Sequence, residues 1–229
     1  MTSESKGPEF KPTPAQMKAQ GVLASGAEHI ALGGGSRSGK TFWLLRAVIV
    51  RALKAPESRH VVFRFRFNAV KASVILDTLP KVMKTCFPGI EYEMDKTDWY
   101  MTLPGGSQVW FAGLDDADRV EKVLGMEFAT IYFNEASQIP WHSIVMALTR
   151  LAQKNENLEL RTFTDFNPPH KKHWTFKRFV EKVDPETNKP YDRPQDYAFF
   201  LMNPGDNTEN LAPGYLRMLE ALPETARNR

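Results

Sequence analysis

The chain has 229 residues, 42% of them hydrophobic, and a formal net charge of +3, which suits one α/β domain with a sizeable core. Its single cysteine, Cys86, excludes an intrachain disulfide framework, and no stretch is long and apolar enough for a membrane span or a signal peptide. The mildly positive charge permits a polyanionic partner without requiring one. From the cysteine content and the lack of an apolar segment we expect a cytosolic protein.

Hydrophobic periodicity predicts strands that alternate with helices along the chain. Such alternation indicates an α/β fold with a mainly parallel central sheet that is covered by helices on both faces. The predicted strands span residues 28–32, 61–67, 91–95, 100–103, 108–111, 130–133, 158–163 and 197–202. The predicted helices span residues 14–25, 41–55, 69–87, 141–151, 173–183 and 213–222, and Pro80 predicts a bend in the third of them.

A glycine-rich run lies between the first predicted strand and the second predicted helix. Residues 34–41, GGSRSGKT, fit the pattern G-x-x-x-x-G-K-[ST] in the strand–loop–helix context of a phosphate-binding loop. In such a loop backbone N–H groups surround phosphate oxygens, and the new helix directs its positive end at them. A glycine-rich turn that happens to precede a lysine is the alternative. The predicted nucleotide-binding residues are Gly34, Gly35, Ser36, Arg37, Ser38, Gly39, Lys40 and Thr41.

Three side chains of this loop have predicted roles toward ATP and Mg²⁺. Lys40 would reach the β- and γ-phosphates, and the Thr41 hydroxyl would ligate Mg²⁺. Arg37 would touch the γ-phosphate from within the same chain and stabilise transition-state charge. An exposed surface arginine is the alternative for Arg37.

The predicted strand 130–133 ends in two polar residues, Asn134 and Glu135. A carboxylate near a γ-phosphate orients water for in-line attack, so Glu135 is the predicted catalytic residue; an acid at a helix start is the alternative. Asn134 stands where phosphate-loop ATPases usually have an aspartate. Its amide can act on Mg²⁺ through a bound water. Because it brings no charge, a protein that binds ATP without turnover stays an open alternative.

The predicted strand 158–163 runs into the polar sequence TDFNPP at residues 164–169. Polar side chains at the carboxyl end of a neighbouring parallel strand face the ligand crevice of such a sheet. Thr164, Asp165 and Asn167 are therefore candidates for sensing the γ-phosphate. A plain Asn-Pro turn is the alternative.

Taken in order, these motifs resemble one family. TPAQ at 13–16, the arginine-bearing loop, GLDD at 113–116, FNEAS at 133–137 and TDFNPP at 164–169 are together similar to the N-terminal ATPase domain of tailed-bacteriophage terminase large subunits. These proteins are DNA-packaging motors. The resemblance covers nearly the whole chain. It implies a P-loop NTPase fold of the ASCE type, which is a three-layer α/β sandwich with a mainly parallel central sheet and a small C-terminal lid subdomain.

The resemblance also implies roles for single residues. Gln16 would contact adenine, and residues 164–167 would couple hydrolysis to movement. In the oligomeric rings of this family an arginine often completes the ATP site of the neighbouring subunit, and Arg119 is the candidate here. A solvated helix face is the alternative for Arg119.

The division of the chain follows from the same resemblance. We expect a flexible tail at 1–12, an ATPase core at 13–170, a lid or linker subdomain at 171–222 and, at 223–229, the start of a linker to an absent nuclease domain. Because no later acidic cluster could hold two metal ions, DNA cleavage is not expected. The implied partners are double-stranded DNA, a small terminase subunit and further copies in a homo-oligomeric, pentamer-like ring on the capsid portal. The implied location is the host cytoplasm, without a membrane.

The leading prediction is therefore ATP hydrolysis that powers translocation of double-stranded viral DNA into a procapsid. A helicase-like DNA ATPase, an ATP-binding assembly module with little turnover and a small-molecule kinase are the alternatives. A translocase that accepts any sequence should contact phosphates rather than bases. The basic residues considered for such contacts, each also compatible with an ordinary surface charge, are Arg64, Arg66, Lys71, Lys171, Lys172 and Lys177.

Overall fold

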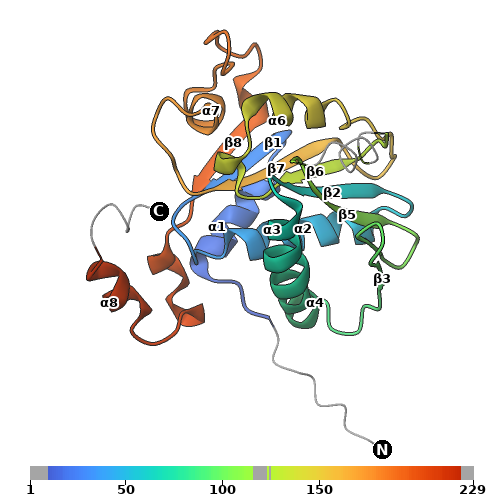
Figure 1. The fold of residues 1–229 in the computed structure, drawn as a ribbon, viewed down its shortest axis with the longest axis horizontal. Coiled ribbons are helices and arrows are strands. Elements are labelled where there is room, and N and C mark those ends of the chain that lie inside the picture. Colours follow the sequence, from blue (N-terminus) through green and yellow to red (C-terminus); the bar gives the residue numbers. More distant parts are fainter. Residues whose placement is uncertain (1–9, 116–122, 124, 223–229) are drawn as a thin grey trace, which may run out of the picture.

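A computed structural model describes residues 10–115, 123 and 125–222. Within these residues the chain forms an eight-stranded sheet of order β3-β4-β5-β2-β6-β7-β1-β8 (Figure 1). Neighbouring strands from β5 to β8 are parallel, and β4 runs antiparallel to both β3 and β5. The strands are β1 (His29–Gly33), β2 (Arg59–Arg64), β3 (Glu93–Asp95), β4 (Tyr100–Thr102), β5 (Gln108–Gly113), β6 (Thr130–Phe133), β7 (Arg161–Phe166) and β8 (Tyr197–Leu201).

Helices cover both faces of the sheet, which gives three layers (Figure 1). Side chains along each strand alternate between the two faces: in β6, Tyr132 packs into one core cluster, while Ile131 and Phe133 pack into the other. The first cluster lies under α1 (Pro14–Leu23), α2 (Lys40–Lys54) and α4 (Leu79–Cys86), and the second lies under α6 (Trp141–Leu148) and α7 (Trp174–Phe176). The predicted three-layer, mainly parallel α/β fold is thereby confirmed.

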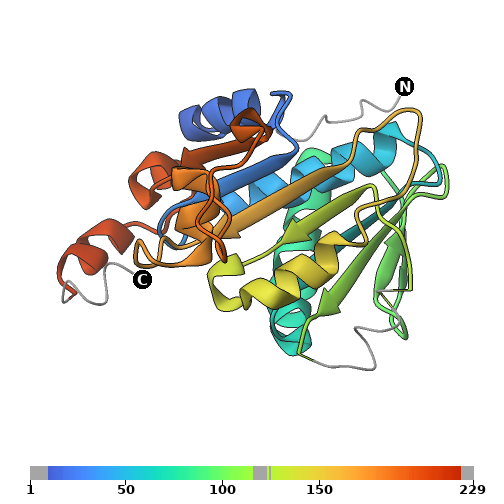
Figure 2. The same cartoon turned by 90° about the horizontal axis from the view of Figure 1, so that it is seen from above.

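The order of the strands decides which side chains can meet. β7 lies between β1 and β6, so three strands that are far apart in the sequence run side by side (Figure 2). Because these strands are parallel, their carboxyl ends meet at one edge of the sheet, where ligands bind in open α/β sheets.

Local sequence explains how the two helices beside this edge begin. Thr13 caps α1 through a capping box with Gln16, and Pro14 occupies the first turn, where the missing N–H costs nothing. α2 begins at Lys40 directly after Gly39, whose φ of +85° is readily adopted only by glycine.

Two predicted strands are displaced by three residues at one or both ends, while the others agree with the structure within two residues. β2 ends at Arg64, and α3 (Phe67–Val70) begins three residues later, so the predicted strand 61–67 extends three residues too far. Phe63 and Phe65 pack on one face of the sheet, and Phe67 packs with the core cluster of the other face. β7 spans Arg161–Phe166 rather than 158–163. The shift places Thr164 and Asp165 inside the strand instead of in a loop after it.

The predicted helix 69–87 is a succession of three helical segments. α3 passes into the π-helical segment η1 (Lys71–Thr78) and then into α4. Pro80 stands at the start of α4, and a proline cannot donate the backbone hydrogen bond that would continue an α-helix. The helix therefore changes from π-helical to α-helical geometry directly before Pro80, where the sequence predicted a bend.

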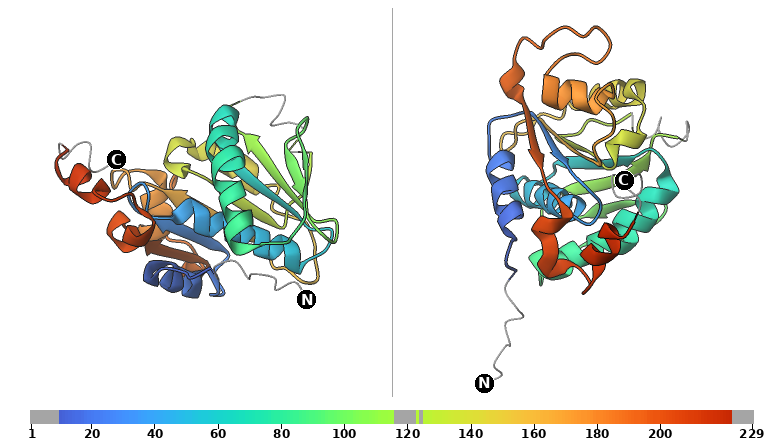
Figure 3. Two further views of the ribbon diagram at one scale, coloured as in Figure 1. Left: turned by 90° about the horizontal axis from the view of Figure 1, so that it is seen from below. Right: turned by 90° about the vertical axis from the view of Figure 1, so that its left-hand side faces the viewer.

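The segment expected as a lid, 171–222, includes part of the central sheet. It begins with α7 and the π-helical η3 (Lys177–Glu181), and after the short η4 (Pro194–Asp196) its strand β8 pairs with β1. Beyond β8 follow η5 (Pro204–Asn210) and α8 (Tyr215–Glu220); α8 buries none of its residues and lies at one end of the molecule (Figure 3). The division at residue 170 stays a prediction. Among the described helices, none has the length and apolar character needed to cross a membrane.

The buried side chain of His60 forms a hydrogen bond between β2 and β6. Nδ1 of His60 lies 2.8 Å from the Thr130 hydroxyl, and Nε2 lies 2.8 Å from the Ser58 hydroxyl. Burial, with a smaller contribution from Arg51, lowers the pKa of His60 from 6.5 to about 3. The imidazole of the unfolded chain begins to take up a proton near its ordinary pKa of about 6.5. At that pH the ring of the folded protein is still neutral.

This burial predicts a loss of stability in mild acid. Between pH 6.5 and 5 the unfolded chain protonates His60 and the folded chain does not, so the free energy of unfolding falls with pH, by about 2 kcal/mol for this one residue. Urea unfolding of the unsubstituted chain and of His60→Gln should therefore give stabilities that converge by that amount as pH falls. The matched control is His142→Gln at an exposed position, which should keep the unsubstituted slope. Parallel curves for the unsubstituted chain and His60→Gln would contradict the prediction.

Candidate nucleotide-binding site

The loop between β1 and α2 is held between the ends of two other strands. The Gly34 N–H donates to Phe166 O at 3.1 Å, and the Met202 N–H donates to Gly33 O at 2.8 Å. Gly34 has a φ of +140°, and a Cβ added there would lie 1.6 Å from the Met202 carbonyl oxygen. Only glycine fits at this position, because both the conformation and the space exclude a side chain.

The ammonium group of Lys40 lies inside this loop. Lys40 is 6% exposed, and burial lowers its pKa, while the negative charges of Asp165 and Glu135 act in the opposite direction. The ammonium is thus surrounded by acceptors at the position where a phosphate-binding loop holds phosphate oxygens. It donates to Gly34 O at 2.7 Å, to Gly35 O at 2.8 Å and to the Ser38 hydroxyl at 3.0 Å.

The carboxyl ends of β6 and β7 bring an amide and a carboxylate to the first turn of α2. The Thr41 hydroxyl donates to Asp165 Oδ2 at 2.7 Å. Asn134 Nδ2 donates to Asp165 Oδ1 at 3.0 Å and lies 3.4 Å from Thr41 Oγ1. The backbone N–H of Glu135 donates to Asp165 Oδ1 at 2.8 Å. Asp165, which is 2% exposed, is therefore the acceptor at the centre of this cluster.

Glu135 lies beside the cluster and is held by an ion pair. It follows β6 with a φ of +48°, an uncommon conformation for a residue other than glycine. Arg64, at the end of β2, donates to Glu135 Oε2 and to the Ser73 hydroxyl. Gln138 Nε2 donates to the same glutamate oxygen at 2.7 Å. Because the Arg64 side chain is only 11% exposed, its interpretation as a surface charge for DNA is wrong.

The three residues expected to sense the γ-phosphate divide between the two faces of the sheet. Asp165 faces Thr41, and Asn167 contacts the loop twice, through Lys40 Nζ at 3.4 Å and through the Ser36 hydroxyl at 3.3 Å. Thr164 is 2% exposed and points to the opposite face, because successive side chains of a strand alternate.

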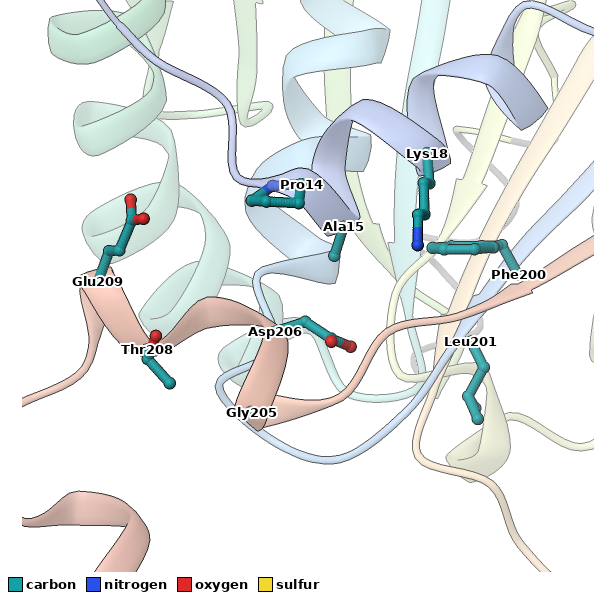
Figure 4. A pocket seen from close by; sticks show the side chains of 9 residues that line it. All are labelled: Pro14, Ala15, Lys18, Phe200, Leu201, Gly205, Asp206, Thr208 and Glu209. Atoms are coloured by element: carbon teal, nitrogen blue, oxygen red, sulfur yellow. The ribbon is translucent and has the colours of Figure 1, made fainter.

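A segment from the C-terminal part of the chain covers the other side of the loop. Asn207 Nδ2 donates to Arg37 O at 2.7 Å, and a Cβ added at Gly35 would lie 3.1 Å from the Pro204 ring. Between η5, the end of β8 and α1 lies a cavity of about 480 Å³. Its walls carry Lys18, Phe200 and Asp206 among other residues (Figure 4).

Gln16 lies near this cavity with one end of its amide already engaged. It is 4% exposed, and its Oε1 accepts from the Thr13 N–H at 2.9 Å. Its Nε2 lies 3.4 Å from the place where a Cβ on Gly39 would be. The amide therefore reaches the loop with its donor end, while its acceptor end caps α1.

The structure brings together most of the residues that the sequence singled out. Lys40, Thr41, Asn134, Asp165 and Glu135 form one cluster, and Arg37 is exposed at the tip of the loop. Arg119 lies outside the described residues. The contacts of Arg64, Gln138 and Asn207 at this site were not predicted from the sequence. The Asn-rich polar run after β8 was the only signal for Asn207, and nothing local indicated the other two.

The cluster fits Mg²⁺ by its chemistry. Mg²⁺ prefers hard oxygen ligands and keeps several waters, so it needs few protein ligands when a phosphate is present. Thr41 offers a hydroxyl, and the buried Asn134 Oδ1 has no hydrogen-bond partner among the described residues. No group of three or more His, Cys, Asp or Glu side chains that could hold a metal occurs in that part of the chain. A metal here would depend on Thr41, on water and on nucleotide oxygens.

The chain is similar to a known protein family over most of its length. The family model of the phage terminase large subunit matches residues 27–225. No curated protein sequence matches the chain.

Solved structures of phage large terminases share the fold of this chain. The large terminase of a thermophilic bacteriophage has a TM-score of 0.76 at 16% identity, with 95% of this chain and 52% of that chain covered. The same terminase was solved in complex with ADP, with a TM-score of 0.75 at 17% identity and the same coverage. The ATPase domain of the Thermus phage P74-26 large terminase has a TM-score of 0.61 at 13% identity, with 94% of this chain and 90% of that chain covered. The chain thus spans about half the length of the first of these relatives.

The close approach at Gly34 gives a test of the loop geometry. Gly34→Ala should lower the free energy of unfolding by about 3 kcal/mol or more, since both the φ and the contact with Met202 must change. The matched control is Gly205→Ala, because a Cβ there meets nothing within 4 Å, and it should stay within about 0.5 kcal/mol of the unsubstituted chain. Urea unfolding measures both, and equal stabilities for the two variants would show that the strand β8 does not hold the loop in this way.

Proposed function

Because the chain belongs to the phage terminase large subunit family, we propose that it is the motor part of such a subunit, which hydrolyses ATP to move double-stranded DNA into a procapsid. One observation carries this proposal: Lys40 and Thr41 from the loop meet Asp165 and Glu135 from the ends of β7 and β6. Such a site has a cation for the phosphates, a hydroxyl for a metal and a carboxylate for the attacking water.

The proposed reaction assigns one task to each side chain. Lys40 would exchange its loop carbonyl partners for the β- and γ-phosphate oxygens of ATP. Thr41 would hold Mg²⁺, which neutralises charge on those phosphates when bound. Glu135 would orient a water in line with the γ-phosphorus and take its proton. Since Arg64 and Gln138 both donate to Glu135 Oε2, they would hold that carboxylate at a fixed position at the rim of the site.

The contacts of two residues support a coupling role for the end of β7. Asn167 joins Lys40 and Ser36 of the loop, and Asp165 joins Thr41 and Glu135. A change at the γ-phosphate would therefore reach β7 through either residue. Thr164, on the opposite face, would transmit such a change to the core under α6 and α7 rather than contact the nucleotide.

The proposed adenine site is the cavity between α1 and η5. The segment η5 forms one wall of this cavity, and its Pro204 and Asn207 contact the loop, so a base in the cavity would lie close to phosphates in the loop. The large terminase of the thermophilic bacteriophage has been solved in complex with ADP. Gln16 would offer Nε2 to a ring nitrogen, because its Oε1 already caps α1.

The remaining partners belong to the whole assembly. We propose a homo-oligomeric ring of the pentamer type on the capsid portal, with a small terminase subunit, in the host cytoplasm. Arg119 stays the proposed arginine for a neighbouring subunit, and Arg37 is the second candidate near the γ-phosphate. DNA cleavage is not proposed for this chain.

An ATP-binding module with little turnover is the second candidate function. Asn134 favours it, because the residue carries no charge where an aspartate is usual. The two candidates differ in turnover and agree in binding, so phosphate release separates them.

Two substitutions test the assignment of the site. Glu135→Gln should lower the rate of phosphate release by about 100-fold or more, while the affinity for ATP stays unchanged. Lys40→Ala should lose ATP binding itself, since no other described side chain donates to the loop interior from that position. Turnover is measured as phosphate release at several protein concentrations, and ATP binding is measured by titration with a fluorescent ATP analogue. Unchanged turnover in Lys40→Ala would make the site assignment wrong, and no turnover in the unsubstituted chain at any concentration would favour the binding module.

Gln16→Glu tests the base contact separately from the fold. Glutamate keeps the acceptor that caps α1, so the melting temperature should stay unchanged. It removes the Nε2 donor, so ATP affinity should fall by about 10-fold, the effect of losing one buried hydrogen bond. Competition by tripolyphosphate, which has no base, is the control for the added negative charge. An equal loss for ATP and tripolyphosphate would exclude Gln16 from base recognition.

A further inference from the structure

Asn134 leaves the site without an acid on the strand where the metal-supporting carboxylate is usual, and the neighbouring strand has one. Asp165 accepts from the Thr41 hydroxyl at 2.7 Å, and it is 2% exposed. A hydroxyl that ligates Mg²⁺ through its oxygen must turn its hydrogen toward another acceptor. Asp165 Oδ2 is the acceptor that the structure gives to Thr41.

The positions of Asn134 and Asp165 are equivalent in the sheet. β6 and β7 are parallel and in register as far as Phe133 opposite Thr164, so Asn134 and Asp165 are the next pair along the two strands. Both face α2: Asn134 Nδ2 lies 3.4 Å from Thr41 Oγ1, and Asp165 Oδ2 lies 2.7 Å from it. A carboxylate on either strand would therefore reach the same hydroxyl.

The orientation of Asn134 fits this division of tasks. Its Nδ2 donates to both carboxylate oxygens of Asp165, at 3.0 and 3.3 Å, and to the Tyr132 hydroxyl at 3.2 Å. Its Oδ1 is buried and has no partner among the described residues. The amide thus stabilises the neighbouring carboxylate through its donor end and leaves an acceptor for a metal-bound water.

We propose that Asp165 supplies the negative charge that supports Mg²⁺ at this site, acting through Thr41 and water, and that it does so in place of the acid missing at Asn134. Asp165 is a positioning residue here, since it acts on the metal through another group. The inference rests on the proposed function, because it requires a nucleotide with Mg²⁺ in the loop.

Exchange of the two side chains tests the proposal without relying on turnover. The probe is a fluorescent ADP analogue, titrated once with MgCl₂ present and once with EDTA present. The dissociation constant in EDTA divided by the dissociation constant in MgCl₂ measures how much the metal strengthens binding. Asp165→Asn should reduce this ratio by about 10–100-fold, the range for loss of a group that orients a metal ligand. A change in binding that does not involve the metal affects both dissociation constants alike and leaves the ratio unchanged. The double variant Asn134→Asp with Asp165→Asn should restore the ratio, because it returns one carboxylate and one amide to the pair.

Controls separate this idea from a structural role and from the proposed function. Glu135→Gln also removes a nearby negative charge, and it should change the ratio much less, because Glu135 does not contact Thr41 through its side chain. A wild-type ratio in Asp165→Asn, or a double variant that stays weak, would overturn the inference. If the melting curve shows that Asp165→Asn is unfolded, the double variant alone decides. Failure of the double variant to fold would also contradict the claim that the carboxylate can be exchanged between the two positions. Absence of ADP binding by the unsubstituted chain would instead refute the proposed function.

Discussion

The buried ammonium of Lys40 constrains the arrangement of every other charge in this site. A buried cation is costly unless it has both hydrogen-bond acceptors and opposite charge nearby. The loop supplies the acceptors through Gly34, Gly35 and Ser38. The opposite charges come from Asp165 and Glu135, which lie at the carboxyl ends of two other strands. The loop therefore depends on the sheet order for its electrostatic stability, as well as for its shape.

The parallel sheet meets this requirement because it gathers distant residues at one edge. β7 lies between β1 and β6, so the carboxylate of Asp165 is placed between the loop and Glu135. In turn, Glu135 needs compensation at the rim, and Arg64 from the end of β2 provides it. From the loop outward, the positive charge of Lys40 is thus followed by the two negative charges of Asp165 and Glu135 and then by the positive charge of Arg64.

The sequence predicted those parts of the site that depend on short stretches of chain. The loop could be found because its glycines, lysine and threonine act within eight consecutive residues, and β6 could be found because four successive buried residues precede Asn134. The contact of Asp165 with Thr41 spans 124 positions, so no local pattern indicates it. Arg64 was misplaced for a related reason. The alternating run 61–67 favours a longer strand, but Asp115 accepts from the Phe67 N–H at 3.2 Å and the chain turns into α3.

The same close packing that fixes the loop also connects it to the C-terminal segment. Met202 lies against Gly34 without room for a methyl group, and Asn207 holds the backbone of Arg37. A loop that reshapes around phosphates must therefore move η5 with it or break these contacts. On the other side, Asn167 and Asp165 tie the loop to β7. Nucleotide binding, as proposed for this chain, would therefore act on two segments at once, one in the sheet and one outside it. A difference in how the two segments move would give the relative motion on which the proposed ATP-driven motor depends.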